Sequence, residues 1–227
     1  MFFSTSVLYL SHRNFDESMK TKDKILQEAL KQFNERGTDA VSIRSIGDAI
    51  GISAGNLAYH FKNTDAIIYQ LYLNLAEALN QQVAKTQDLE MSLHSLAKRT
   101  KETFQILFTY RFLLIDFVHI NRRVEGLQKH FLSLMDMRRM QFRFVFELFQ
   151  QKGLFRKDIT NEQYAELSDI IILYSNAWIS DGIVRFEGTK EELISRYARL
   201  FFMMTLPYLS SEGKKAFEEV LEGWGSL

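Results

Sequence analysis

The amino-acid sequence predicts an all-α protein, and two observations support this. Apolar residues recur through most of the chain at the three- and four-residue spacing of amphipathic helices. The 227 residues include a single proline, the residue that most strongly disrupts a helix, and 46% of them are hydrophobic. A chain of this length can bury a substantial core, and a division into one small and one larger domain is natural.

We expect three parts along the chain. Residues 1–18 have a brief apolar start but lack the basic segment and the long apolar run of a cleaved signal, and Met19 is followed by a basic Lys-Thr-Lys segment. We therefore interpret 1–18 as an extension that is poorly ordered or that results from a misplaced start site. Residues 19–65 form the expected small domain, and residues 66–227 form the larger one.

The small domain contains three predicted helices. Apolar spacing predicts the first over 21–36, and two shorter apolar runs follow within 42–61. Gly51 separates these two runs and can adopt the positive φ of a sharp helix exit. Ser42 and Ser53 stand at the starts of the two runs, where serine side chains cap helices by accepting backbone N–H bonds. The sequence from 42 to 61 therefore predicts a helix, a tight turn and a second helix.

The last of these helices is too short to be stable alone, so it must be held by packing. Leu57 and Phe61 are four residues apart and can supply that packing. The opposite face carries small, amide, aromatic and imidazole side chains, which suit base edges and phosphates, and the N–H groups at a helix N-terminus attract anions. This pattern is typical of a recognition helix in the DNA major groove.

A spaced pattern runs through residues 20–68 without an insertion. It consists of Thr21, Ile25, Ala29, Phe33, Gly37, Ile46, Gly51, Ser53, Gly55, Leu57, Tyr59 and Phe61. The pattern resembles the amino-terminal domain of the TetR family of transcriptional regulators. It departs from the family at Ala58, where an aromatic residue is often found, and at residues 63–65, where a lysine followed by an acid is common. The resemblance implies a three-helix helix-turn-helix DNA-binding domain followed by a larger helical ligand-binding and dimerisation domain.

Eight side chains of the small domain are candidate DNA contacts. They are Thr21, Ser42, Arg44, Ser53, Asn56, Tyr59, His60 and Lys62. Asn56 is the candidate for a base edge, whereas the cationic and hydroxyl side chains fit phosphates. The alternative is that they are surface residues of an ordinary helical hairpin. Residues 19–65 hold seven Lys and Arg against six Asp and Glu, and the whole chain has a formal net charge of zero, so we expect modest non-specific affinity.

Helical spacing continues through the larger domain. It predicts helices over 64–86, 93–108, 124–151, 161–182, 190–207 and 212–222. The helix over 64–86 would belong to both domains, and the resemblance implies that tilting it changes the spacing of two recognition helices. The apolar segment 104–120 is too short and too charged to span a bilayer, so no membrane partner is expected.

The phenylalanine-rich region over 104–149 is a candidate lining for a ligand pocket, because such pockets are mostly apolar. Phenylalanine at helical spacing is, however, more often part of the hydrophobic core. The candidate ligand contacts are the aromatic residues Phe104, Phe108, Phe142, Phe146, Tyr174 and Trp178 and the polar residues Arg111, Asp116, His119 and Asn176. Asp116 and His119 alone are too few groups for a metal site or a catalytic dyad. With no cysteine and no recognisable catalytic motif, we expect no metal, no cofactor and no enzymatic activity.

The segments 161–182 and 190–207 carry more large apolar side chains than one face of a monomer needs. The resemblance implies that such final helices pair in a twofold dimer, which would bind a palindromic double-stranded operator. We expect a cytoplasmic transcriptional repressor released by a bulky, largely apolar small molecule. That the protein represses transcription, rather than activating it, is what the resemblance implies. The alternative is a helical protein- or lipid-binding module with a degenerate DNA-binding domain.

Overall fold

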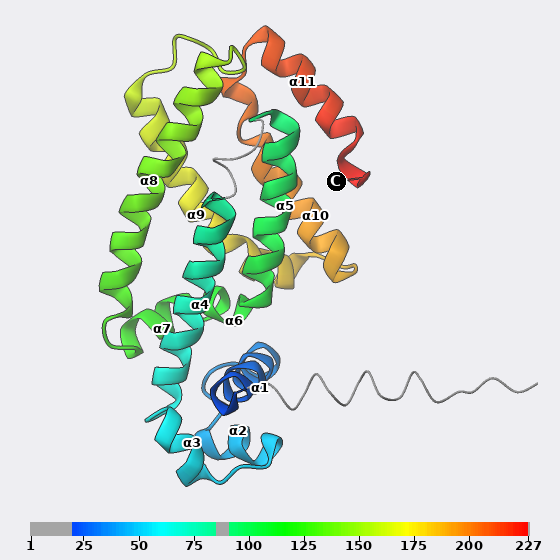
Figure 1. The fold of residues 1–227 in the computed structure, drawn as a ribbon. Coiled ribbons are helices and arrows are strands. Elements are labelled where there is room, and N and C mark those ends of the chain that lie inside the picture. The colour runs from blue at the N-terminus through cyan, green and yellow to red at the C-terminus, as the bar shows by residue number, and fades with distance from the viewer. Residues whose placement is uncertain (1–19, 85–90, 227) are drawn as a thin grey trace, which may run out of the picture. The chain divides into compact units, whose positions relative to one another are not determined.

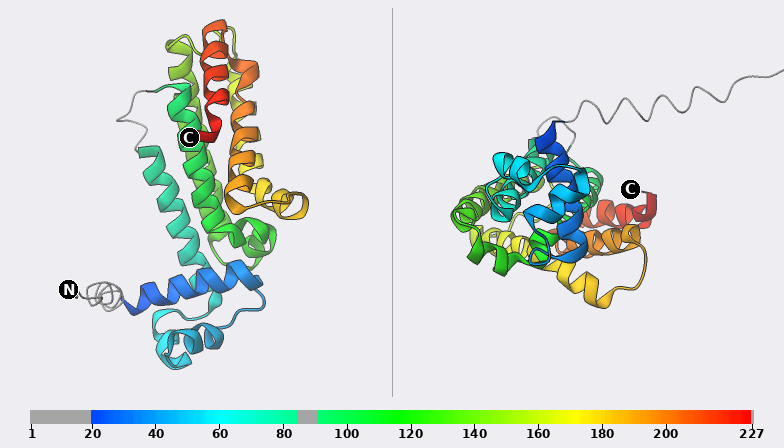
Figure 2. Two further views of the ribbon diagram at one scale, coloured as in Figure 1. Left: turned by 90° about the vertical axis from the view of Figure 1, so that its right-hand side faces the viewer. Right: turned by 90° about the horizontal axis from the view of Figure 1, so that it is seen from below.

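The computed structural model describes residues 20–84 and 91–226 (Figures 1 and 2). Within these ranges the elements are α-helices and short 3-10 turns without a β-strand, which confirms the predicted all-α class. The chain divides into two compact units, Met1–Leu71 and Tyr72–Leu227. This division falls inside one helix, and the domain boundary expected at residue 65 stays a prediction. The expected extension over 1–18 lies outside the described residues.

The first unit is built from short helices around a small apolar core. Its helices are α1 (Thr21–Arg36), α2 (Ile43–Ile50), α3 (Ala54–His60) and the first turns of α4 (Thr64–Ala84). The fully buried side chains at its centre are Ile25, Ala29, Phe33, Ile46, Leu57, Ile67 and Ile68. Because every helix of the unit contributes to this core, the short α2 and α3 are held by burial that they could not supply alone.

Local hydrogen bonds fix where α2 and α3 begin. The Ser42 hydroxyl accepts from the Ser45 N–H, and the Ser45 hydroxyl accepts in turn from the Ser42 N–H, which completes a capping box. The Ser53 hydroxyl accepts from the Asn56 N–H at the start of α3. Gly51 ends α2 with a φ of 72°, in the left-handed region. The expected caps and turn are therefore present.

The second unit contains the remaining helices, labelled in Figure 1. They are the later turns of α4, α5 (Leu93–Thr109), α6 (Arg111–Ile115), α7 (Phe117–Arg123), α8 (Leu127–Gln151), α9 (Asn161–Arg185), α10 (Lys190–Met203) and α11 (Ser211–Glu222), with 3-10 turns at Leu206–Tyr208 and Trp224–Ser226. Helix α5 packs against α10 and α11, and α9 packs against α6, α8 and α10. None of the described helices is long and apolar enough to cross a bilayer.

Three stretches differ from what the sequence led us to expect. The apolar segment after α5, for which no helix was predicted, forms the short helices α6 and α7. The long helix expected from about residue 124 begins at Leu127, because Gly126 before it has a φ of 78° and cannot continue a helix. The helix expected over 190–207 ends at Met203, and Pro207 lies in the 3-10 turn that follows.

A close backbone contact explains one glycine of α2. A Cβ atom built on Gly47 would lie 2.8 Å from the carbonyl oxygen of Ile52, in the turn that leads to α3. The Ile52 N–H donates to the Gly47 carbonyl at 3.0 Å, so the backbone of the turn cannot move away without losing that bond. Only glycine permits this approach.

We therefore expect Gly47→Ala to lower the free energy of unfolding of the first unit by about 1–3 kcal/mol, the usual cost of overpacking. Chemical denaturation followed by circular dichroism measures this change. Gly55→Ala is the control, because a Cβ on Gly55 would meet only the Ser53 hydroxyl, at 3.9 Å. Equal stability of both variants and the wild type would contradict the steric argument.

Candidate functional site

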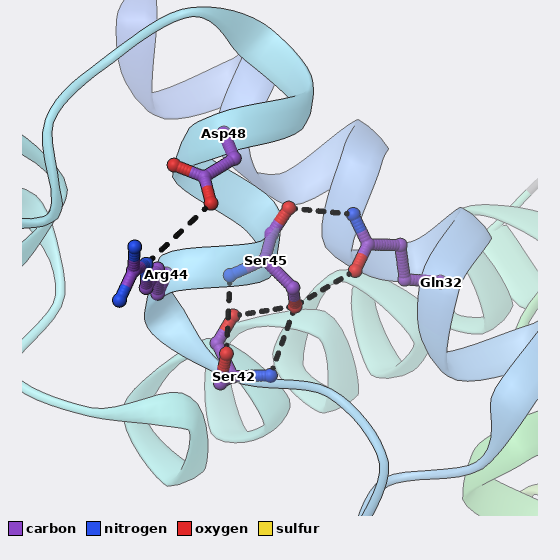
Figure 3. A network of polar contacts seen from close by, with 5 residues as sticks. All are labelled: Gln32, Ser42, Arg44, Ser45 and Asp48. Atoms are coloured by element: carbon purple, nitrogen blue, oxygen red, sulfur yellow. Dashed lines mark hydrogen bonds and ion pairs between the residues drawn. The ribbon is translucent and has the colours of Figure 1, made fainter.

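A buried glutamine holds α2 against α1 (Figure 3). The Gln32 side chain of α1 is 5% exposed, and its amide nitrogen donates to the Ser45 carbonyl at 3.2 Å. Its amide oxygen accepts from the Ser45 hydroxyl at 3.0 Å and from the Arg36 guanidinium. Since Ser45 also forms the capping box with Ser42, one network fixes both the start of α2 and its attachment to α1. The sequence analysis did not identify Gln32, because a glutamine on a helix usually faces solvent.

Six of the eight candidate DNA contacts are exposed on the helix-turn-helix. These are Ser42, Arg44, Ser53, Asn56, Tyr59 and Lys62, whereas Thr21 and His60 are half-buried. Tyr59 is 85% exposed, which is unusual for a large aromatic side chain with no apolar cover. Its ring meets the His60 ring edge-on, with 5.4 Å between the centroids. The free face of α3 thus presents an amide and an aromatic side chain to solvent, while Leu57 is fully buried on the other face.

Two of these candidates already have a structural role as helix caps. The hydroxyls of Ser42 and Ser53 cap α2 and α3, so any contact with a phosphate would add to that role. Arg44 lies 3.7 Å from the Asp48 carboxylate one turn along α2, and both side chains are largely exposed. A pair of this kind contributes little to stability, so the Arg44 guanidinium is available to another anion. The individual DNA contacts stay predictions.

A small apolar cavity lies inside the second unit. Its volume is about 70 Å³, and it is lined by α4, α6, α7 and α8, with one residue each from α5 and α9. Its lining residues are Tyr72, Leu75, Ala76, Leu79, Leu107, Leu113, Leu114, Phe117, Ile120, Asn121, Leu127, Phe131, Leu134, Met135 and Asn176. An apolar cavity of about 150 Å³ can hold benzene, and pockets for larger ligands enclose about 300–1,000 Å³. A bulky ligand would therefore have to move these walls apart.

The predicted aromatic ligand contacts lie elsewhere. Phe104 is buried with its ring 4.8 Å from Trp178 and 6.2 Å from Tyr174, so these three rings fill the core between α5 and α9. The Tyr174 hydroxyl donates to the Tyr197 carbonyl at 3.0 Å, and burial raises the pKa of Tyr174. This hydroxyl is neutral and already bonded to α10, which is the role of a structural group rather than a ligand anchor.

The other predicted aromatics also pack against protein. Phe142 and Phe146 stack on each other, and Phe146 stacks on Phe155 and Tyr164. Phe108 lies under the cations of Arg111 and Lys190, at 5.0 and 5.4 Å from the ring centroid. None of the six predicted aromatic residues lines the cavity, because their rings fill space between helices. Helical spacing alone does not distinguish a core position from a cavity wall.

The predicted polar anchors are divided between two places. Asp116 and His119 line an open hollow outside the cavity, together with Leu173 and Asn176. Arg111 lines neither the hollow nor the cavity, and Asn176 lines both. No group of three or more potential metal ligands occurs among the described residues. Asn121 lines the cavity and was not identified from the sequence.

Two hydrogen bonds join α4 to α8 beside the cavity. The Tyr72 hydroxyl lies 3.0 Å from Nδ1 of His130, and their rings meet edge-on. Two turns further along α4, the Asn80 side-chain oxygen accepts from the Arg138 guanidinium at 2.7 Å. Arg138 is 7% exposed, and burial lowers its pKa. A movement of α4 that opens the cavity would have to stretch or exchange these bonds.

Helices α8 and α9 each expose several large apolar side chains. On α8, Met137, Met140 and Phe144 follow one another at three- and four-residue spacing. On α9, the exposed apolar residues include Ile170, Leu173, Ile183 and Val184. Helix α10, in contrast, packs against α5 and α9, and Leu200 is its exposed large apolar side chain. Such exposed apolar side chains on neighbouring helices are typical of a protein interface.

Models of known protein families match residues in both units of the chain. A sequence model described as bacterial regulatory proteins, tetR family, matches residues 25–71, and one described as bacterial transcriptional repressor matches residues 74–217. The chain is 24% identical over 106 residues to the probable HTH-type transcriptional regulator YttP of Bacillus subtilis, covering 47% of each chain. It thus spans about half the length of that curated relative.

Solved structures share the fold. A TetR-family transcriptional regulator from Marinobacter aquaeolei superposes with a TM-score of 0.82 at 22% identity, covering 91% of this chain and 99% of that one. The ketosteroid transcriptional regulator KstR2 of Mycobacterium tuberculosis superposes with a TM-score of 0.61 at 15% identity, covering 85% and 96%. At these identities the likeness concerns the fold.

Proposed function

Because this chain belongs to the TetR family of bacterial transcriptional regulators, we propose that it is a sequence-specific DNA-binding repressor released from its operator by a small, largely apolar molecule. The observation that carries the proposal is the exposed face of α3. That face has no packing role, since Leu57 anchors the helix from the other side. An exposed amide and an exposed aromatic ring on a firmly capped short helix suit the major groove.

Gly55 adds a second argument for close approach by DNA. Glycine lowers helix stability by about 1 kcal/mol relative to alanine, so a glycine within α3 needs a reason. Its backbone is helical, and a Cβ atom there would touch only the Ser53 hydroxyl, at 3.9 Å. Because the protein itself leaves space for a side chain, we propose that the space is needed for the DNA backbone.

The effector would act through α4. This helix lines the cavity with Tyr72, Leu75, Ala76 and Leu79, and its first turns belong to the first unit. A ligand larger than the cavity favours a conformation in which α4 has moved, and DNA affinity falls if the recognition helices are then wrongly spaced. The KstR2 regulator, described as a ketosteroid regulator, is an example of a fold relative named for an apolar class of molecule.

We propose that the operator is read by a twofold dimer formed through α8 and α9. The exposed apolar side chains of α8 and α9 support this interface. Helix α10, in contrast, buries most of its large apolar side chains against other helices of the same chain. From the sequence we expected this interface over 161–182 and 190–207; α9 covers the first of these segments, and α8 takes the place of the second. Two recognition helices then read two half-sites, which one helix of this length could not do with useful specificity.

The function is tested by selecting bound fragments from random double-stranded DNA with the purified protein. We expect an enriched palindrome. Asn56→Ala should cost about 1–3 kcal/mol of binding free energy and relax one base position, whereas Tyr59→Ala should weaken binding to all sequences. Gly55→Ala should leave stability unchanged or raised while it lowers DNA affinity. No enrichment at low salt, by a folded dimer, would favour the alternative of a helical module with a degenerate DNA-binding domain.

The dimer interface is tested by Phe144→Asp on α8. Burying a carboxylate in an apolar interface is costly, so the dimer dissociation constant should rise by tenfold or more, about the effect of losing a central interface residue. Sedimentation velocity at micromolar concentration measures it. Leu200→Asp, on α10, is the matched control and should leave the dimer intact. A dimer that is weakened by Leu200→Asp but not by Phe144→Asp would contradict this proposal and favour the interface expected from the sequence.

A further inference from the structure

The cavity wall is almost entirely hydrocarbon. Among the described residues no charged side chain lines it, and its polar members are Tyr72, Asn121 and Asn176. The Tyr72 hydroxyl is already in hydrogen-bond contact with His130. A ligand with a charged group would lose its hydration there without compensation, so the wall fits a neutral molecule.

Asn121 is a residue of this wall and carries a buried hydrogen-bond acceptor. It lies on α7, and its side-chain nitrogen donates to the Phe117 carbonyl one turn earlier, at 2.8 Å. A backbone carbonyl can only accept, so this bond fixes which end of the amide is nitrogen and which is oxygen. The side-chain oxygen is buried and accepts no hydrogen bond from any described group of the protein.

A buried carbonyl oxygen that has no partner is costly and uncommon in folded proteins. Asn121 is a residue of the cavity wall, so a molecule whose entry separates the walls could reach this oxygen and donate to it. Asn176 differs, because it also lines the open outer hollow and its side-chain atoms are not among the buried polar atoms that lack a partner. Asn121 is therefore the polar group best placed to select a ligand.

We propose that the effector is a neutral, largely apolar molecule that carries a hydroxyl group, and that this hydroxyl donates to the side-chain oxygen of Asn121. The inference rests on the proposed function, in which the cavity of the second unit takes the effector. It adds the chemical class of the ligand and names Asn121 as the residue that determines specificity. The 70 Å³ volume requires that the walls separate as the apolar part enters.

The test uses two probes, 4-propylphenol and its methyl ether 4-propylanisole, in which a methyl group replaces the hydroxyl hydrogen so that the oxygen can no longer donate. Calorimetric or NMR titration gives a dissociation constant for each with the full chain. The quantity of interest is the ratio of the two constants, compared between the wild type and Asn121→Leu, because this comparison cancels the different hydration of the free probes. We expect the preference for the phenol to fall by about 3- to 10-fold in the variant, the net contribution of one buried hydrogen bond.

Asn176→Leu is the matched control, since it removes the other amide of the wall, and it should keep the preference of the wild type. Asn121→Ala is the second variant if leucine disturbs folding, which thermal unfolding checks. An unchanged ratio in both Asn121 variants, loss of the preference in Asn176→Leu alone, or no binding of either probe by the wild type up to its solubility limit would overturn the inference.

Operator affinity measured in parallel separates this inference from the proposed function. A protein that binds the phenol with the expected preference but selects no DNA contradicts the repressor and keeps the ligand site. A protein that binds its operator but shows no preference dependent on Asn121 contradicts the ligand site and keeps the repressor.

Discussion

Helix α4 imposes the main constraint on this molecule, because one continuous hydrogen-bonded rod contributes to two separate cores. Its Ile67 and Ile68 are fully buried in the first unit, and its Leu75 and Ala76 are buried in the second. A helix resists bending between its ends, so a displacement at one set of contacts is carried to the other. In the proposed repressor, the later turns of α4 line the cavity, and its first turns contribute to the core that holds the capped helix α3.

Two discrete arrangements of that helix fit the packing of the second unit. The cavity is small, and α4 is joined to α8 by Tyr72 and Asn80 through specific hydrogen bonds. Packed walls and directional bonds favour distinct states over gradual deformation. A ligand that binds more tightly to the arrangement with separated cavity walls favours that arrangement. The ratio of its two affinities then sets the largest factor by which DNA affinity can fall. The exposed faces of α8 and α9 would convert this change in one chain into a change of spacing between two recognition helices.

The sequence was most informative where structure is decided locally. Ser42, Gly51 and Ser53 fix caps and a turn within a few residues, so the helix-turn-helix was predictable. The short helices α6 and α7 were not predicted, because neither Tyr110 nor Asp116 is a helix breaker and nothing in the apolar spacing marks where these two helices begin and end. The ligand residues were harder still. Spacing identifies the inward face of a helix but not whether that face meets a ring, as Phe104 does, or a cavity, as Asn121 does.

The central claim is that an effector in the second unit changes the spacing of the two recognition helices of a dimer. The chain has no cysteine, so Ala40→Cys, exposed in the turn before α2, accepts one spin label per protomer. Pulsed electron paramagnetic resonance then measures the distance between the two labels, first with operator DNA bound and then with an effector that releases the protein from the operator. We predict one narrow distance on the operator and a shifted mean distance with the effector. An unchanged distance distribution while the effector abolishes DNA binding would contradict the account.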